Sequence, residues 1–329
     1  MRRRLIVYSV CHFLVDLSCA LLLLGRIAPH GDAARLLLFY DFFAFAVQMP
    51  IGVLADEYRR PHYTAALGCV LTALAWLLPG MAGAVCAGLG NALFHIGGGQ
   101  DTLESHEKCA ALGIFVSPGA FGIYFGGVWA FRASSLTVPA ILVLLLAALL
   151  ILRLCAVEKY PMPDCPPEQE ALTPALVLTL GCLTLVVVLR SLLGSLFDFP
   201  WKAALGPAMT CAVVLGKALG GVLSDRFGLR RTAAVSLLLA ALLFVFSDSA
   251  PAGLAAVFLF NMTMPMTLWG AARRLPTHKS FAFGLLTFAL FLGILPVFLD
   301  WAMPPALLTC LAGTLLSLPL LLIGVREVV

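Results

Sequence analysis

Long apolar stretches alternate along this chain with short polar breaks such as "PGMAG" and "MPP". The hydrocarbon core of a bilayer is about 30 Å thick, and a helix needs about 20 apolar residues to cross it. Twelve of the apolar stretches have roughly this length. They predict twelve membrane-spanning helices at residues 5–25, 35–55, 62–79, 82–100, 109–131, 136–153, 172–197, 203–223, 232–248, 252–270, 280–300 and 304–325.

Composition agrees with an all-α integral membrane protein. Of the 329 residues, 61% are hydrophobic and only 12% are charged, whereas soluble domains are about 25% charged. The mean hydropathy is +1.01. The net charge of +4 is spread over many short loops, so we expect lipid and not nucleic acid as the surroundings. The ten cysteines form no CxxC pair, and we expect neither a metal site nor a cofactor.

The distribution of basic residues predicts the orientation of the chain, because cytoplasmic loops carry an excess of Lys and Arg. Of the 21 basic residues, 15 fall on the side that contains the N-terminus, four fall on the opposite side and two lie within spans. Both termini are therefore expected to be cytoplasmic. The cytoplasmic (inner) membrane of a cell is the expected location.

The two halves of the sequence resemble each other. Asp56 matches Asp225 at an offset of 169, and Asn91 matches Asn261 at an offset of 170. Each half contains an even number of spans, so the repeats run parallel and are related by an axis along the membrane normal, with a cavity expected between them. We expect a six-helix bundle at 1–154, a cytoplasmic linker at 155–171 and a second six-helix bundle at 172–329.

The stretch "GGVLSDRFGLRR" resembles the loop signature of the major facilitator superfamily. The first copy, "GVLADEYRRP", departs from it, because Glu57 replaces the usual base and Arg59 stands where glycine is expected. "HFLVD" and "GLGNALFHIGGG" are similar to the fosmidomycin-resistance branch of drug–proton antiporters. The resemblance implies the major facilitator fold, in which helices 1, 4, 7 and 10 line the central cavity.

In such a fold the two signature aspartates, Asp56 and Asp225, would act as gates at the cytoplasmic helix ends. A carboxylate there can accept hydrogen bonds from the exposed N–H groups at the start of a neighbouring helix, where the dipole favours negative charge. Nearby bases, Arg60, Arg226 and Arg230, are expected to add charge-assisted bonds. The alternative is that these residues only anchor the topology.

Two polar pairs with helical spacing lie inside the predicted spans. His12 and Asp16 share one helix face, and so do Asn91 and His95. Ionisable groups within a membrane are functional candidates by default. We expect His12, Asp16 and His95 to carry protons, since histidine titrates near neutral pH; substrate contact or a structural role for Asp16 remains the alternative.

The cavity is expected to be lined by Asn91, His95 and Asn261 and by Arg190. Arginine binds carboxylates and phosphonates bidentately, so Arg190 is the candidate for an anionic substrate group; a structural ion pair is the alternative. Asp41 is a possible outer gate. At a constant offset of 169, the counterpart of Asp16 would be the apolar Leu185.

These features predict a monomeric secondary transporter that moves a small molecule by alternating access. We expect proton-coupled export of a drug or of a small anionic metabolite. Proton-coupled nutrient uptake and a transport-inactive receptor or scaffold are the alternatives. No HExxH, GxSxG or nucleotide-binding loop is present in the sequence, so an enzyme is not expected and no residue is assigned a catalytic role.

Overall fold

The computed structural model describes residues 2–164 and 170–326, and every regular element in these ranges is helical. Residues 165–169 of the expected linker and 327–329 of the expected second bundle lie outside the description. Ten helical segments are long and apolar enough to cross a membrane: Arg2–His30, Ala33–Tyr58, Gly80–Ser105, Cys109–Val128, Thr137–Leu154, Pro174–Leu196, Gly206–Phe227, Ala250–Arg274, Lys279–Phe298 and Ala306–Gly324.

Each predicted span overlaps a helical segment of the structure. The two that fall short of a full span are α4 (Pro61–Ala75) and α11 (Leu229–Phe244), with 15 and 16 residues. Large apolar side chains are exposed along the outer faces of the helices; Leu142, Leu146 and Leu149 of α8 (Thr137–Leu154) are 60%, 53% and 50% exposed. Such faces would cause aggregation in water but are the normal lipid-facing surface of a multi-pass membrane protein.

The chain forms two compact units. Unit 1 consists of Met1–Glu107, Pro118–Met162 and His278–Phe288, and unit 2 consists of Lys108–Ser117, Pro163–Thr277 and Ala289–Val329. Each unit is therefore built mainly from one half of the sequence. Each also takes in one short helical segment from the other half.

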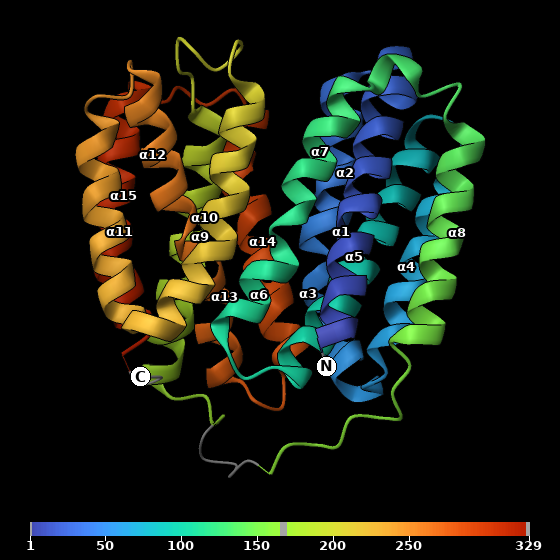
Figure 1. Ribbon diagram of the computed structural model, residues 1–329, viewed down its shortest axis with the longest axis horizontal. Helices are drawn as coiled ribbons and strands as arrows, with labels where there is room; N and C mark the ends of the chain where they lie inside the picture. Colours follow the sequence, from blue (N-terminus) through green and yellow to red (C-terminus); the bar gives the residue numbers. More distant parts are fainter. Residues whose placement is uncertain (1, 165–169, 327–329) are drawn as a thin grey trace. The chain divides into compact units, whose positions relative to one another are not determined.

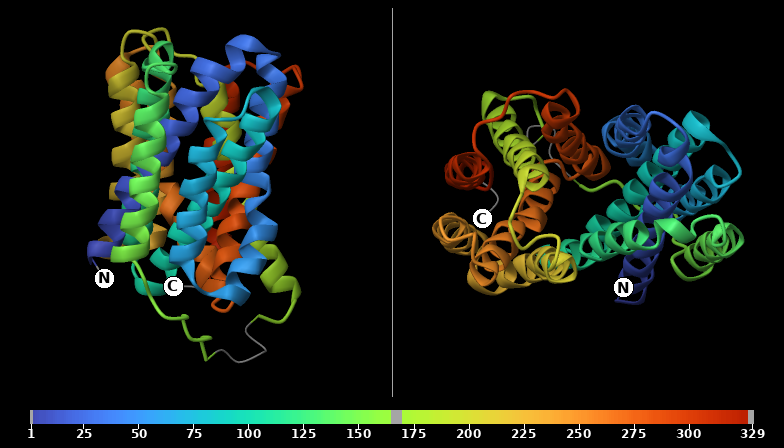
Figure 2. Two further views of the ribbon diagram at one scale, coloured as in Figure 1. Left: turned by 90° about the vertical axis from the view of Figure 1, so that its right-hand side faces the viewer. Right: turned by 90° about the horizontal axis from the view of Figure 1, so that it is seen from above.

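Unit 1 is built around α1, which packs against α5 and α7, and α4, which packs against α5 and α8 (Figures 1 and 2). Short π-helical turns interrupt two of its spans, after α1 and after α2. The elements in chain order are α1 (Arg2–Leu22), η1 (Leu23–Ile27), η2 (Ala28–His30), α2 (Ala33–Asp41), η3 (Phe42–Ala46), α3 (Gln48–Tyr58), α4, α5 (Gly80–Ser105), α7 (Pro118–Val128), η4 (Ala130–Arg132), α8 and the first part of α14 (Lys279–Phe298).

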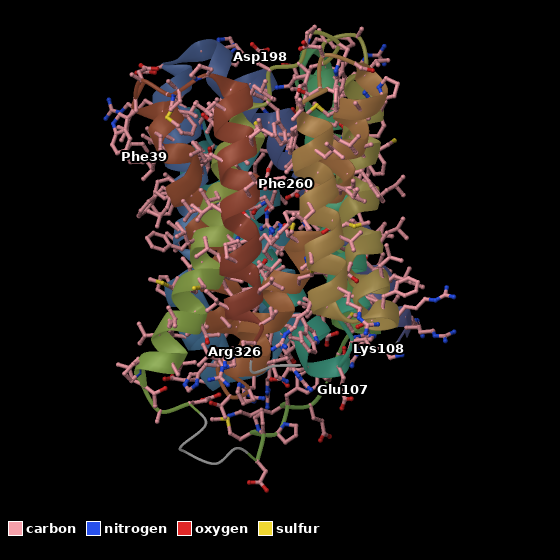
Figure 3. All side chains as sticks on the ribbon, turned by 90° about the vertical axis from the view of Figure 1, so that its left-hand side faces the viewer. Phe39, Glu107, Lys108, Asp198, Phe260 and Arg326 are labelled. Atoms are coloured by element: carbon pink, nitrogen blue, oxygen red, sulfur yellow. The ribbon has the colours of Figure 1, made fainter. Side chains whose placement is uncertain are left out.

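Unit 2 is built around α9, which packs against α13 and α15, and α10, which packs against α6 and α12. Asp198 and Arg326 lie toward opposite ends of this unit, with Phe260 between them (Figure 3). Its elements are α6 (Cys109–Val116), α9 (Pro174–Leu196), α10 (Gly206–Phe227), α11, α12 (Ala250–Asn261), α13 (Thr263–Arg274), the remainder of α14 and α15 (Ala306–Gly324).

Matching close contacts in the two units reflect the sequence repeat. A β-carbon on Gly284 would lie 2.4 Å from the carbonyl oxygen of Gln48, and one on Gly113 would lie 2.6 Å from that of Lys217. The two glycines are related by an offset of 171 and the two carbonyl groups by an offset of 169, as in the signature repeat. In both units, therefore, a helical segment borrowed from the other half meets the equivalent helix at backbone contact.

Candidate functional site

Four polar side chains meet inside unit 1, where α1 and α5 pack together. His12 and Asp16 come from α1, and Asn91 and His95 come from α5. All four are buried, and Asp16 is only 7% exposed. The four-residue spacing places each pair on one helix face, and the packing of α1 against α5 brings the two faces together. The structure thus gathers four residues that the sequence marked separately.

Hydrogen bonds connect the cluster. Asn91 Nδ2 donates to Asp16 Oδ1 at 2.8 Å, and His12 Nε2 lies 3.2 Å from Asp16 Oδ2. The Nε2 atoms of His12 and His95 are 2.8 Å apart, and His95 Nε2 lies 3.8 Å from Asp16 Oδ1. The carboxylate therefore has one amide donor and two imidazoles beside it.

The network assigns the proton positions on the imidazoles. His95 Nδ1 lies 2.8 Å from the carbonyl oxygen of Asn91, which can only accept, so Nδ1 carries a hydrogen and donates. The Nε2 atom of neutral His95 is then an acceptor, and His12 Nε2–H is its donor. Two Nε2 lone pairs at this separation would repel each other. The site consequently requires a proton, or another cation, between the two rings.

The same donor set has a second chemical capacity. One ligand atom each from His12, Asp16 and His95 lie within 4.8 Å of one another. Imidazole and carboxylate are ligands that transition-metal ions accept, with bonds of about 2.0–2.2 Å for Zn²⁺. Geometry alone therefore permits either a shared proton or a divalent transition-metal ion, and an experiment must separate the two.

Helix α7 approaches this cluster so closely that a side chain at residue 119 would displace its polar groups. A β-carbon on Gly119 would lie 2.3 Å from Asp16 Oδ2 and 2.4 Å from His12 Nε2. One turn further along the helix, a β-carbon on Gly122 would lie 2.4 Å from the carbonyl oxygen of Phe13. The glycines of "SPGAFGIYFGG" thus form the third wall of the site.

The contacts of Gly293 correct the expected counterpart of Asp16. Gly122 meets the Cβ of Asp16, and Gly293, its repeat partner at an offset of 171, meets the Cβ of Ser191. The structural counterpart of Asp16 is therefore Ser191 and not Leu185. A constant offset fails because the first half has six more residues between this helix position and its signature aspartate, and its π-helical turns each add a residue.

Arg190 lies next to this counterpart on the buried face of α9. It is 7% exposed, its other buried neighbours on that face include Val186, Val187 and Leu193, and its Nη1 has no hydrogen-bond partner. No described residue of unit 2 forms an ion pair or hydrogen bond with it. An unpaired charge of this kind is strongly unfavourable in an apolar interior, so the guanidinium is available to an anionic ligand.

The other two predicted site residues have simpler surroundings. Asn261 is buried at the end of α12, and its Nδ2 donates to Val257 O one turn earlier at 2.8 Å. Asp41 ends α2 directly before a π-helical turn and is partly exposed. Such turns frequently mark functional positions, which keeps Asp41 a prediction for the outer gate.

The two signature aspartates cap helices that come from the other half of the sequence. In unit 1, Asp56 accepts from the backbone N–H groups of Ser280 (2.9 Å) and Phe281 (2.8 Å) at the start of α14. In unit 2, Asp225 accepts from those of Cys109 (3.0 Å) and Ala110 (2.8 Å) at the start of α6. The paired amides are again related by an offset of 171, so one interaction occurs twice.

The bases expected to support these carboxylates make other contacts. Arg60 is exposed, Arg226 lies over the ring of Phe227, and Arg230 donates to the carbonyl oxygen of Arg326. None of the described ion pairs joins them to Asp56 or Asp225. Each carboxylate is already satisfied by two N–H groups, and the arginines remain hydrated at lower cost.

Sequence reasoning missed Arg59, which it treated only as a departure from the signature. Arg59 has φ 55° and ψ 33°, a left-handed conformation that costs about 1–2 kcal/mol for a residue other than glycine. The repeat-equivalent residue, at an offset of 169, is Gly228 with φ 89°. Despite its charge, Arg59 is 2% exposed and pairs with Glu104 at 2.6 Å. The available signal was an arginine where the second copy has glycine.

Comparisons with known proteins identify the fold. No family model matches the chain, and no curated protein matches it. Ten helical segments of membrane-spanning length and composition indicate a multi-pass membrane protein, and solved structures show its fold.

The chain has the fold of the major facilitator superfamily transporters. It is similar to a structure of the transporter FucP in the outward conformation, with a TM-score of 0.73, 14% identity and coverage of 97% of both chains. It is also similar to the human organic anion transporter MFSD10, with a TM-score of 0.71, 14% identity and coverage of 98% and 99%. A third similar structure is a bacterial homologue of the iron transporter ferroportin, with a TM-score of 0.66, 16% identity and coverage of 99% and 100%. These are transporters and not enzymes; no match to the fosmidomycin-resistance branch appears among them.

The contact of Gly119 with the cluster gives a stability prediction. We expect Gly119→Ala to lower the unfolding free energy by about 1–3 kcal/mol, because the new methyl group overpacks against Asp16 and His12. The melting temperature of the purified protein in detergent measures the effect. Gly127→Ala on the same helix is the control, since its β-carbon would have only Leu24 Cδ1, at 3.5 Å, as a neighbour. Equal melting temperatures for both variants would contradict the close contact.

Proposed function

We propose that this protein is a secondary transporter that moves a small organic anion across the membrane by alternating access, coupled to protons. Twelve helices would cross the membrane, including the short α4 and α11, with both termini cytoplasmic. The proposal keeps the two sequential six-helix bundles, 1–154 and 172–329, as its moving bodies. Major facilitator structures at full chain coverage support this architecture.

The observation that carries the proposal is the buried His12–Asp16–His95 cluster within membrane-spanning helices. A carboxylate beside two imidazoles, with one Nε2–H between the rings, can hold an added proton as an imidazolium–carboxylate pair, so the proton leaves no lone charge. Gain of the proton converts an imidazole to a cation beside a carboxylate; its loss leaves the carboxylate held by Asn91. Conformational change that alters these contacts would therefore be linked to proton binding. One structural neighbour is described as a fucose:proton symporter.

Arg190 supplies the substrate class. A buried guanidinium without a partner in its unit suits a carboxylate, phosphate or phosphonate, which it can bind with two parallel hydrogen bonds. The neighbour described as an organic anion transporter agrees with this class. Asn91, His95 and Asn261 would provide polar contacts, and Asp56 and Asp225 would close the cytoplasmic side through their helix caps.

Export of a drug or anionic metabolite is the direction we favour, from the resemblance of "HFLVD" and the helix containing His95 to drug–proton antiporters. Uptake by symport would use the same groups, but the proton and the substrate would move in the same direction. A receptor would bind the anion without moving it, so transport into vesicles separates the three.

The first functional prediction concerns proton coupling. In proteoliposomes with an imposed pH gradient, the wild-type protein should accumulate an anion identified by a thermal-shift screen of lactate, benzoate and fosmidomycin. Asp16→Asn should abolish the gradient-driven accumulation while exchange of labelled for unlabelled anion continues, because the group that links proton to conformation is lost. Pyranine inside the vesicles reports the proton movement.

Metal chemistry at the same residues is the competing explanation. Transport that is unaffected by EDTA, with His95→Gln behaving as Asp16→Asn does, supports the proton. Asp198→Asn is the control, since this acidic residue lies at an end of unit 2 (Figure 3). Gradient-driven transport that survives Asp16→Asn would overturn the proton assignment.

The second functional prediction concerns Arg190. We expect Arg190→Gln to abolish the thermal shift that the anion produces, and Arg190→Lys to weaken binding by about tenfold or more, because lysine cannot form the bidentate pair. The melting temperature without ligand should not fall in Arg190→Gln, since an unpaired buried charge is removed. Arg132→Gln, at an exposed arginine, is the matched control. An unchanged ligand shift in Arg190→Gln would contradict the anion site.

A further inference from the structure

Arg59 joins three parts of unit 1. Its Nη2 donates to Glu104 Oε1 at 2.6 Å and to Pro161 O at 2.8 Å, and its Nε donates to Tyr160 O at 3.0 Å. Its own carbonyl oxygen accepts from the N–H of Tyr160 at 3.1 Å. One side chain therefore ties the end of α3 to the end of α5 and to the segment that leads into the linker.

The linker segment has a second attachment close by. Tyr160 OH donates to Asp101 Oδ1 at 3.0 Å, and Arg4 lies against both the Tyr160 ring and the Asp101 carboxylate. Burial, reinforced by the carboxylate, raises the pKa of Tyr160, so the phenol remains a donor over the physiological range. Residues 160 and 161, shortly after the end of α8, are thus held against the helix ends by backbone and side-chain bonds.

The same network reaches the gate. Glu104 Oε2 accepts from Lys279 Nζ at 2.8 Å, and Lys279 is the first residue of α14, whose next two N–H groups are capped by Asp56. Asp56 lies on α3, three residues before Arg59, which caps the end of this helix. The carboxylate of Glu104 therefore links the arginine that holds the linker to the helix that the gate aspartate holds.

Among the described residues, this arrangement occurs in the first repeat alone. Arg59 corresponds to Gly228, which has no side chain and no neighbour within 4 Å of its β-carbon position. At offsets of 169–171, Glu104 corresponds to Arg273–Leu275, which contain no carboxylate. Lys108, the counterpart of Lys279, therefore has no equivalent bridge. The pairing of Glu104 with both Arg59 and Lys279 thus belongs to the half that continues directly into the linker.

We infer that Arg59 and Glu104 form a clasp that couples the 160–161 segment of the linker to the contact between α3 and α14. While the linker is held, the start of α14 stays on α3; release of the linker lets this contact open. Arg59 and Glu104 are positioning residues in this scheme and do not touch substrate. The inference rests on the proposed transport cycle for its biological meaning, but the coupling itself is a property of unit 1.

Hydrogen exchange of the purified protein in detergent, without ligand, tests the clasp. We expect Glu104→Gln to speed exchange of the Ser280 and Phe281 amides by about tenfold, because their cap depends on α14 staying in place. Arg59→Gly should have a similar effect, although it restores the glycine of the second repeat and removes backbone strain. Arg59→Lys should give an intermediate rate. Lysine can pair with Glu104, but it cannot also donate to the carbonyl oxygens of Tyr160 and Pro161.

A substitution in the linker segment itself provides a second test. Tyr160→Gly, which removes the bond to Asp101 and loosens the segment, should also speed exchange at Ser280 and Phe281. Lys159→Gln, an exposed neighbouring residue, is the control and should leave both rates unchanged.

The second repeat provides an internal reference. The amides of Cys109 and Ala110 carry the equivalent cap from Asp225 and should exchange at wild-type rates in all of these variants. Unchanged exchange at Ser280 and Phe281 in Glu104→Gln would overturn the clasp. Equal acceleration at both pairs of amides would also overturn it, because the substitution would then have weakened the whole protein.

Transport assays keep the two proposals apart. Selective acceleration in a wild-type protein that transports none of the screened anions supports the clasp and counts against the proposed substrate. Transport together with unchanged exchange in Arg59→Gly and Glu104→Gln supports the proposed function and removes the clasp.

Discussion

An ionised side chain inside a bilayer has no water to bind, so its partners must come from the protein or from a ligand. This constraint organises the interior of unit 1. Asp16 is held by Asn91 and two imidazoles, and α7 approaches the cluster so closely that a β-carbon at residue 119 would displace Asp16 and His12. In unit 2 the same constraint is not met within the unit, because Arg190 has no partner there among the described residues. A ligand that completes its hydrogen bonds is the simplest way to satisfy it.

The N–H groups at the start of a helix also need partners, but there the partner can be exchanged for water. The first N–H groups of a helix have no partner within that helix, and Asp56 and Asp225 supply one for α14 and α6. At a helix end, water can replace a carboxylate when the contact opens, whereas near the middle of a span it cannot. A contact at a helix end can therefore open at lower cost than a contact between charged groups deep inside a span.

Local spacing predicted the helices and the two polar pairs, because four residues make one helical turn wherever the helix packs. It could not predict that the Nε2 atoms of His12 and His95 would lie 2.8 Å apart, since that depends on how α1 packs on α5. A constant repeat offset pointed to Leu185 and missed Ser191, because π-helical turns and a longer connection shift the register of the first helix. The expected partners of the signature aspartates were arginines, but both carboxylates accept from backbone N–H groups instead.

The departure of the first signature from its pattern has a physical interpretation. A glycine at residue 59 would adopt the left-handed conformation without strain, since glycine tolerates a positive φ, as Gly228 shows with φ 89°. An arginine there accepts the strain and gains a charged partner and two carbonyl acceptors. Arginine in place of glycine is tolerated only where the charged partner and the two carbonyl acceptors are present. Among the described residues, only the half that leads into the linker has these partners. The two repeats therefore share their helix caps but differ in what surrounds them: the first half carries the histidine–aspartate cluster and the linker clasp, and the second carries the lone arginine. The transport mechanism that we propose assigns proton binding to the first half and anion recognition to the second.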